Sequence, residues 1–248
     1  MKILVCISCV PDTTSKINFT DENKEFSKDG VQYVINPNDE FGLTRAMWIK
    51  EKDGSSIDII NVGTQSNEPI LRKALAIGAD RAFRVDEDPK DSFRVAKLIS
   101  NHILKNGYDL IIAGRESIDY NGGMVPGMIS ALTNINFIDK CIALNISGNS
   151  VEASREIEGG KENISSNLPL IIGGQKGLVE ESDLRIPNMR GIMLARKKEL
   201  VVLETSDDPI ATHSKSFEKP QPKEEVTLVS SDDIEKLIDL LHNEAKAL

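Results

Sequence analysis

The chain has 248 residues, which is enough for one large or two small domains with a substantial core. Hydrophobic residues make up 40% of it and predict a globular protein. Its 30 basic and 39 acidic residues give a formal net charge of -9, which argues against nucleic acid or an anionic membrane as the main partner. No apolar run reaches the ~18 residues of a membrane span, so we expect no membrane insertion. The first residues enter a strand pattern without a separate signal peptide, which favours a cytoplasmic protein.

Mostly apolar runs alternate with helical patterns through the first half of the chain. Buried strands are predicted at 2–7, 57–62, 81–85 and 110–113. Helices are predicted over 39–52, 67–77, 92–104 and 124–132, and a small hairpin between residues 15 and 30. Expected helix caps are Asn38 or Asp39, Ser66 or Asn67, and Ser92. This alternation predicts an α/β fold with a doubly wound, mostly parallel sheet of the Rossmann-like, adenine-nucleotide-binding kind.

The second half begins with shorter strand patterns. Strands are predicted at 138–144, 150–157, 162–166 and 168–172, with a turn over 145–149. A basic run follows at Arg190, Arg196, Lys197 and Lys198. Such a run fits either a solvated helix face or a surface for a partner with an acidic patch.

The last part of the chain differs in composition. We predict a nucleotide-binding domain over 1–200 and an arm with a terminal helix over 201–248, because Pro209, Pro220 and Pro222 interrupt a mostly polar stretch. Ser231 is expected to cap the helix. Its apolar stripe is Ile234, Leu237, Ile238 and Leu241. A short helix cannot bury such a stripe alone, so it docks either on its own domain or on another subunit, and we favour the second.

One crevice is expected to hold the ligand. In open parallel sheets, ligands bind at the carboxyl ends of the strands where the strand order reverses. The strands ending near Cys6, Val62 and Ala113 reach that edge, and residues 36–39 are placed beside it. The last of these strands leads into the glycine-containing stretch 114–127, whose small residues would let backbone N–H groups approach a phosphate. Glycines between a strand and a helix are also ordinary turn residues.

The three cysteines, Cys6, Cys9 and Cys141, give no metal site. The CxxC spacing of Cys6 and Cys9 would need a second pair to hold zinc. A redox dithiol usually lies at a helix start, whereas this pair follows a strand. We therefore expect Cys6 to be a small buried residue beneath a ligand.

Six sequence blocks occur in the order found in a known family. They are Lys2–Ile7 with Val10–Thr13, Ile35–Pro37, Lys73–Arg81, Gly114–Asp119, Arg155–Gly160 and Arg185–Lys198. Through them the chain resembles the beta (small) subunit of electron-transfer flavoproteins over nearly its whole length. The resemblance implies pairing with a larger alpha subunit that holds most of an FAD, and a structural AMP in this subunit. It also implies electron transfer from acyl-CoA dehydrogenases or other flavin dehydrogenases to a quinone oxidoreductase, as in fatty acid oxidation, with no catalytic acid, base or nucleophile here.

The resemblance also assigns residues. Those expected to bind the cofactor are Cys6, Asn36, Pro37, Asn38, Asp39, Val62, Gly114, Ser117, Asp119, Asn121, Gly122, Gly123, Met124 and Val125. Backbone N–H groups of Asn121, Gly122 and Gly123 would contact the phosphate, and Cys6 would lie under the base. Those expected to bind partners are Ile186, Pro187, Met189, Ile192 and Met193, in a segment that docks on the dehydrogenase with Met189 as anchor, and the four stripe residues of the terminal helix, which reach the alpha subunit.

Three alternatives compete with this interpretation. Some relatives bind a second FAD in place of AMP and bifurcate electrons. A stand-alone nucleotide-binding regulator of the universal-stress type shares the sheet pattern, but would not need the arm and its helix. An ATP-cleaving adenylating enzyme needs a Ser- and Gly-rich loop after the first strand, where this chain has Ser8-Cys9-Val10-Pro11-Asp12.

Overall fold

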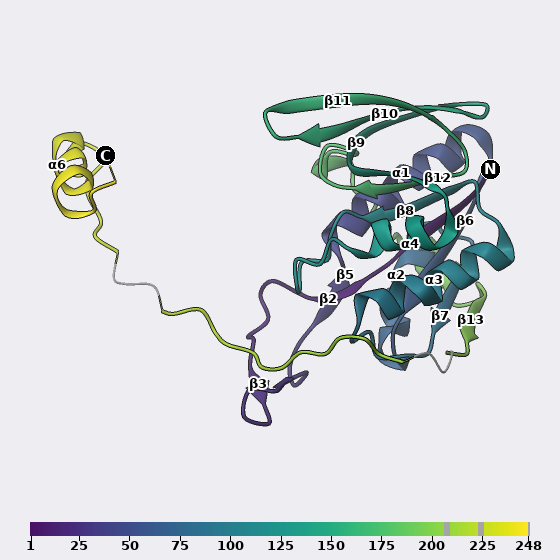
Figure 1. Ribbon diagram of the computed structural model, residues 1–248, viewed down its shortest axis with the longest axis horizontal. Coiled ribbons are helices and arrows are strands. Elements are labelled where there is room, and N and C mark those ends of the chain that lie inside the picture. Colours follow the sequence, from purple (N-terminus) through teal and green to yellow (C-terminus); the bar gives the residue numbers. More distant parts are fainter. Residues whose placement is uncertain (206–208, 223–225, 248) are drawn as a thin grey trace.

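A computed structural model describes residues 1–205, 209–222 and 226–247 (Figure 1). Its centre is a nine-stranded sheet in the order β11-β10-β9-β12-β8-β1-β6-β7-β13. The strands are β1 Lys2–Cys6, β6 Ser56–Val62, β7 Arg81–Val85, β8 Leu110–Gly114, β9 Asn136–Ser147, β10 Ser150–Ile157, β11 Gly160–Asn167, β12 Leu170–Gly174 and β13 Leu200–Leu203. The part of the sheet from β9 to β13 in this order is parallel throughout. Strands β10 and β11 extend the sheet beyond β9 as antiparallel strands.

Helices cover both faces of this sheet, and a further helix lies at the end of the arm (Figure 1). The helices of the domain are α1 Pro37–Asp53, α2 Glu68–Ile77, α3 Ser92–Asn106, α4 Val125–Thr133 and α5 Met189–Ala195, and the helix of the arm is α6 Ile234–Asp239. Leu43 of α1 and Leu71 of α2 belong to the core on one face, with Ile3 of β1. Ile99 of α3 and Ile129 of α4 belong to the core on the other face. The predicted doubly wound α/β fold is therefore confirmed, because central strands buried on both faces need apolar residues at almost every position.

The strand order reverses beside β1. From β1 the chain moves through β6 to β7 on one side, and then returns to place β8 and β12 on the other side. The carboxyl ends of β1 and β8 therefore lie side by side at the reversal, with Val5 paired to Ile112. This is the position at which open α/β sheets bind ligands.

The predicted elements are present, with shifted boundaries. Residues 19–26 form the expected hairpin, as β3 Phe19–Thr20 and β4 Glu25–Phe26. A second ribbon pairs β2 Cys9–Pro11 with β5 Tyr33–Ile35. Strand β9 runs to Ser147, three residues into the expected turn, because Ile146 packs on the core and Gly148 supplies the left-handed turn conformation. Short 3-10 turns lie at Gln65–Asn67 and Glu181–Asp183, and a π turn at Leu240–Glu244 follows α6.

Several expected helix caps are wrong. The side chain of Asp91 caps α3 in place of Ser92, and Asp233 caps α6 in place of Ser231. A carboxylate accepts N–H bonds and also favours the positive helix N-terminus, so aspartate wins over a nearby serine. Helix α1 has Asn36 at its N-cap position, with no side-chain capping bond. The predicted caps Asn38 and Asp39 lie inside the helix, and their side chains bond to the loops after β8 and β1.

The arm lies against its own domain before it reaches the terminal helix. Strand β13 ends at Leu203, three residues past the predicted boundary, and pairs with β7. Asp91 then accepts hydrogen bonds from the Ala211 N–H and the Thr212 hydroxyl, both at 2.9 Å. Further on, the Phe217 ring stacks on Phe19 with centroids 5.1 Å apart. Figure 1 shows this stretch running past β3 towards α6. Among the described residues, no helix is long and apolar enough to cross a membrane.

Candidate functional site

The candidate site lies at the strand-order reversal, where three predicted residues come together. Cys6 ends β1, Val62 ends β6 and Gly114 ends β8, and these strands are neighbours in the sheet. The side chains of Cys6 and Val62 share one core cluster with Ala113. Burial, and secondarily the charge of Asp39, raises the pKa of the Cys6 thiol and brings that of Cys9 to about 12. Both thiols are therefore uncharged at neutral pH, and Cys6 is a small buried residue, as expected.

Asp39 connects the two loops that flank the reversal. From the first turn of α1, its carboxylate accepts hydrogen bonds from the Ser8 N–H at 2.7 Å and the Gly114 N–H at 2.8 Å. Ser8 follows β1 and Gly114 ends β8, so one buried side chain fixes both. Burial raises the pKa of Asp39 to about 7, while the hydrogen bonds from Ser8, Asn36 and Gly114 lower it.

Gly114 permits this close approach. A β-carbon at Gly114 would lie 2.3 Å from Asp39 Oδ1 and 2.8 Å from the Asn38 β-carbon. No side chain fits in that space, so glycine is required where β8 enters the loop. The first glycine of the predicted phosphate loop thus has a packing role.

Two asparagines hold the start of the loop after β8. Asn36 Nδ2 and Asn38 Nδ2 both donate to the Glu116 carbonyl, at 2.9 and 3.1 Å. Asn36 Oδ1 accepts from the Ile118 N–H at 3.3 Å. Pro37 between them is the first residue of α1. These predicted site residues therefore contact the loop itself, and Asn36 is completely buried in doing so.

The tip of the loop, residues 119–123, is shaped by local bonds. The Ser117 N–H donates to the Gly122 carbonyl at 3.3 Å, and Asn121 takes a left-handed conformation with φ 50°. Asparagine tolerates that conformation better than most residues. In the part of the chain that the structure describes, the N–H groups of Asn121 and Gly123 donate to no protein acceptor. Free N–H groups in a turn before a helix are suited to an anion.

Other residues near this site carry no signal in the sequence. Asn61, at 2% exposure, donates from Nδ2 to the Ile7 carbonyl at 2.8 Å and accepts from Asn67 Nδ2 at 3.2 Å, so it ties the end of β1 to the loop after β6. Burial raises the pKa of Tyr33, as do its electrostatic interactions with Tyr120, Asp88 and Asp119. Lys28 Nζ lies 3.6 Å from Asp88 Oδ1. These residues come from distant segments, so periodicity could not group them.

Comparison with known proteins agrees with this architecture. A model of the electron transfer flavoprotein domain matches residues 25–208. This chain belongs to the electron transfer flavoprotein family. It is 33% identical to the electron transfer flavoprotein subunit beta of Bacillus subtilis (strain 168), over 100% of both chains. It is also 33% identical to the subunit beta of Thermoanaerobacterium thermosaccharolyticum, over 84% of this chain and 80% of that one. The subunit beta of Dictyostelium discoideum is 32% identical, over 82% and 80%. The predicted likeness to the small subunit is confirmed.

The predicted partner-binding segment of this electron transfer flavoprotein subunit is exposed. Ile186 is 85% and Met189 74% exposed, although both are apolar. Asn188 caps α5 by accepting a hydrogen bond from the Gly191 N–H at 2.8 Å. Met193 and Ile192 follow on the same short helix and are exposed as well. Such a cluster of large apolar side chains in water is typical of an interaction surface.

The stripe of the terminal helix is also open to solvent. Ile234, Leu237 and Ile238 are exposed, and Leu241 is half-buried in the π turn that follows α6. Figure 1 shows α6 separated from the domain by the arm. The described part of the chain therefore offers two apolar surfaces, one on α5 and one on α6.

Proposed function

We propose that this chain is the small subunit of a heterodimeric electron transfer flavoprotein that binds a structural AMP and helps an alpha subunit to hold FAD. In this proposal it passes electrons from acyl-CoA dehydrogenases or other flavin dehydrogenases to a quinone oxidoreductase, in the cytoplasm and as part of fatty acid oxidation. The observation that carries the nucleotide assignment is the loop after β8, in which the N–H groups of Asn121 and Gly123 are free. This loop follows the strand that neighbours β1, where the strand order of the sheet reverses.

The residues of the crevice fit an adenine nucleotide. Its phosphate would bind to the N–H groups of Asn121, Gly122 and Gly123, before the start of α4. The base would lie against uncharged Cys6 and Val62, with Ser117, Asp119, Met124 and Val125 along the loop. Asn36, Asn38 and Asp39 would act on the nucleotide through the loop, since their polar atoms already bond to protein. FAD, when bound in the heterodimer, would supply the electron-transfer chemistry. The residues of this chain would bind the AMP and help to orient the FAD.

The two apolar surfaces fit two partners. The stripe of α6 would dock on the alpha subunit, because a helix of six residues does not bury its stripe without a partner. The segment from Arg185 to Lys198 would dock on a flavin dehydrogenase. Exposed Arg190, Arg196 and Lys197 surround its apolar residues, so the complementary surface is an apolar pocket with an acidic rim.

Nucleotide content tests the proposal. We would express the chain with its alpha subunit, denature the purified heterodimer and quantify the AMP and FAD that are released. One AMP and one FAD per heterodimer are expected. Two FAD without AMP would assign the subunit to the bifurcating class instead, and a nucleotide-bearing monomer without flavin would favour the stand-alone regulator.

A matched pair of variants tests the loop. A β-carbon at Gly122 has room, since its nearest neighbour is Ser117 Oγ at 3.7 Å. Gly122→Asp should lower the AMP occupancy because it places a negative charge beside the phosphate, whereas Gly122→Asn has the same shape and should retain AMP. Equal AMP content in both variants would place the phosphate elsewhere.

A further inference from the structure

Helix α5 is too short to be stable by itself. It has seven residues, and of these only Ala195 is buried. Isolated helices of this length do not form in water, and its large apolar side chains point away from a core. Its shape must therefore come from bonds to other elements.

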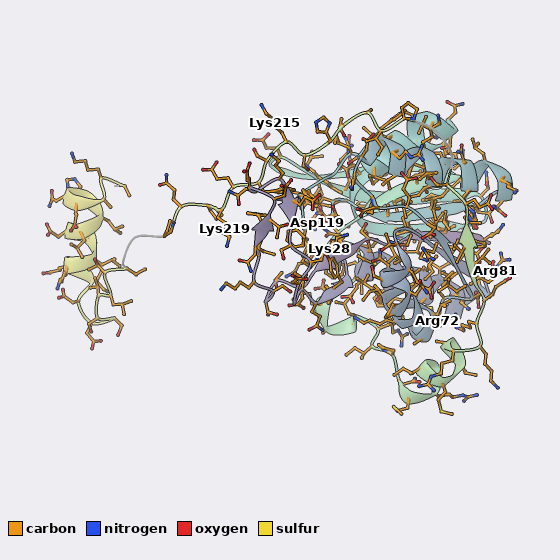
Figure 2. The ribbon with its side chains drawn as sticks, turned by 90° about the horizontal axis from the view of Figure 1, so that it is seen from below. Lys28, Arg72, Arg81, Asp119, Lys215 and Lys219 are labelled. Atoms are coloured by element: carbon orange, nitrogen blue, oxygen red, sulfur yellow. The ribbon has the colours of Figure 1, made fainter. Side chains whose placement is uncertain are left out.

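Arg72 supplies the first of these bonds. From α2, its Nη1 donates to the Ala195 carbonyl at 2.8 Å and to the Lys198 carbonyl at 2.7 Å. These carbonyls end α5 and the turn after it, where helices leave acceptors without partners. A cation at this position also interacts favourably with the helix dipole. Figure 2 shows α5 projecting from the domain next to Arg72.

Lys198 makes the same kind of contact in the opposite direction. From the turn after α5, its Nζ donates to the Leu75 carbonyl at 2.9 Å and the Ala79 carbonyl at 2.5 Å. Leu75 lies in the last turn of α2, and Ala79 follows Gly78, the C-cap of that helix. Each of the two helices thus contributes, from itself or its adjoining turn, the cation that satisfies the other's terminal carbonyls. We call Arg72 and Lys198 the reciprocal clamp.

Other contacts fix the rest of segment 185–198 to the domain. A β-carbon at Gly191 would lie 2.3 Å from the Ala76 carbonyl oxygen, so the backbone of α5 rests directly on the end of α2. At the other end, Arg185 pairs with Glu51 of α1 at 2.7 Å, and its N–H donates to the Thr44 hydroxyl at 3.2 Å. The exposed apolar residues lie between these fixed points.

We propose that Arg72 and Lys198 are positioning residues, which hold segment 185–198 in its docking shape before a partner binds. This inference rests on the proposed function, in which the segment docks on a flavin dehydrogenase. A surface whose binding shape is already populated avoids the cost of ordering on association. Loss of the clamp should lower the population of that shape without touching the partner or the flavin.

The test uses the heterodimer with its alpha subunit. Arg72→Gln and Lys198→Met remove the two halves of the clamp, and Arg72→Lys keeps a cation. Arg155→Gln is the matched control, because Arg155 is also hydrogen-bonded but pairs with Glu162 on the distant β10–β11 ribbon. The first readout is hydrogen exchange of amides 189–198. The second is steady-state reduction of the heterodimer by a purified acyl-CoA dehydrogenase, with the KM for the heterodimer and kcat measured separately.

We expect the exchange rate of these amides to rise about tenfold in Arg72→Gln and in Lys198→Met. A rise of this size corresponds to losing the stabilisation of a hydrogen bond with a charged donor. The KM should rise by a similar factor, with kcat and the flavin potential unchanged. Arg72→Lys should recover part of the effect and Arg155→Gln should resemble the wild type. A general loss of structure would instead raise exchange throughout the domain and lower kcat.

Two results would overturn the inference. Unchanged exchange in both clamp variants would show that other contacts hold the segment. Raised exchange with unchanged KM would show that the clamp does not act on docking, provided that Met189→Glu with Ile186→Glu raises KM in the same assay. If that double variant also leaves KM unchanged, the docking assignment under the proposed function is wrong, and the positioning role is wrong with it.

Discussion

The backbone of Gly114 and the side chain of Asp39 are in such close contact at the candidate site that no side chain fits at position 114. The Gly114 N–H donates to Asp39 Oδ1 at 2.8 Å, and a β-carbon on Gly114 would lie only 2.3 Å from that oxygen. The bond and the missing side chain therefore depend on each other.

We predict that Gly114→Ala destabilises the protein by about 1–3 kcal/mol, because the added methyl group overpacks the site and displaces the Asp39 carboxylate. Gly122→Ala is the matched control, since its β-carbon would lie 3.7 Å from its nearest neighbour. Urea unfolding of both variants measures the difference in their free energy of unfolding, provided that the two m-values are equal. Equal midpoints for the two would contradict this account of Gly114.

His102 predicts a loss of stability in acid. Its Nε2 lies 2.9 Å from the Tyr108 hydroxyl, which donates to Asp58 Oδ2 at 3.0 Å, so Nε2 carries the hydrogen and donates to the tyrosine oxygen. Nδ1 faces the Asn106 amide nitrogen at 3.3 Å and therefore accepts. Burial lowers the pKa of His102 to about 4, from the ordinary value of 6.5, because the charged imidazolium is poorly solvated there; the cations Lys2, Arg81 and Lys105 also lower it, and Asp58 raises it.

The unfolded chain binds this proton below pH 6.5, whereas the folded chain binds it only near pH 4. The His102 contribution is therefore complete above pH 6.5 and falls as the pH drops towards 4, by at most about 1.4 kcal/mol per pH unit. His102→Gln retains a donor to Tyr108 but does not titrate. We expect the wild type to lose more stability than this variant between pH 6.5 and 4, measured by urea unfolding at several pH values. Parallel pH profiles would show that His102 does not titrate in this range.

The stripe of α6 predicts a partner-dependent effect. Ile238→Gln removes an apolar side chain that is exposed in the free chain, and we expect affinity for the alpha subunit to fall about tenfold because a buried contact is lost. Glu235→Gln changes the same helix outside the stripe and should leave the affinity unchanged. Calorimetric titration of the alpha subunit measures both. If the helix docks on its own domain, neither variant will change the affinity.

The stack of Phe217 on Phe19 predicts how firmly the arm is held. Phe217→Ala should speed proteolytic cleavage within residues 209–222, since the stack and the bond from the Phe217 N–H to the Asn23 carbonyl, at 2.7 Å, fix this stretch to the hairpin. Limited proteolysis with mass analysis of the fragments measures the rate. Phe93→Ala, an exposed phenylalanine near the start of α3, is the control and should change it little.

Most strands of the sheet and most helices could be predicted from the sequence, because a strand such as β8 is apolar at nearly every position and α6 repeats its apolar residues at helical spacing. The short strands β2, β5 and β13 were not predicted. It was not sufficient to predict what the polar residues of the site contact. Asn36 and Asn38 bond to Glu116, about 80 positions away, and such pairings leave no local pattern. The choice of Asp233 over Ser231 as a cap also required the backbone. The reciprocal clamp joins residues 126 positions apart.

Helix α2 gives the molecule a fixed internal spacing. Its N-cap residue, Asn67, bonds to Asn61 beside the end of β1, and its middle and C-terminal end hold α5 through Arg72 and Lys198. Ten helical residues span about 15 Å at 1.5 Å per residue. The length of α2 therefore fixes the separation between the candidate nucleotide site and the proposed docking segment, and a partner bound on α5 would lie at a constant distance from that site.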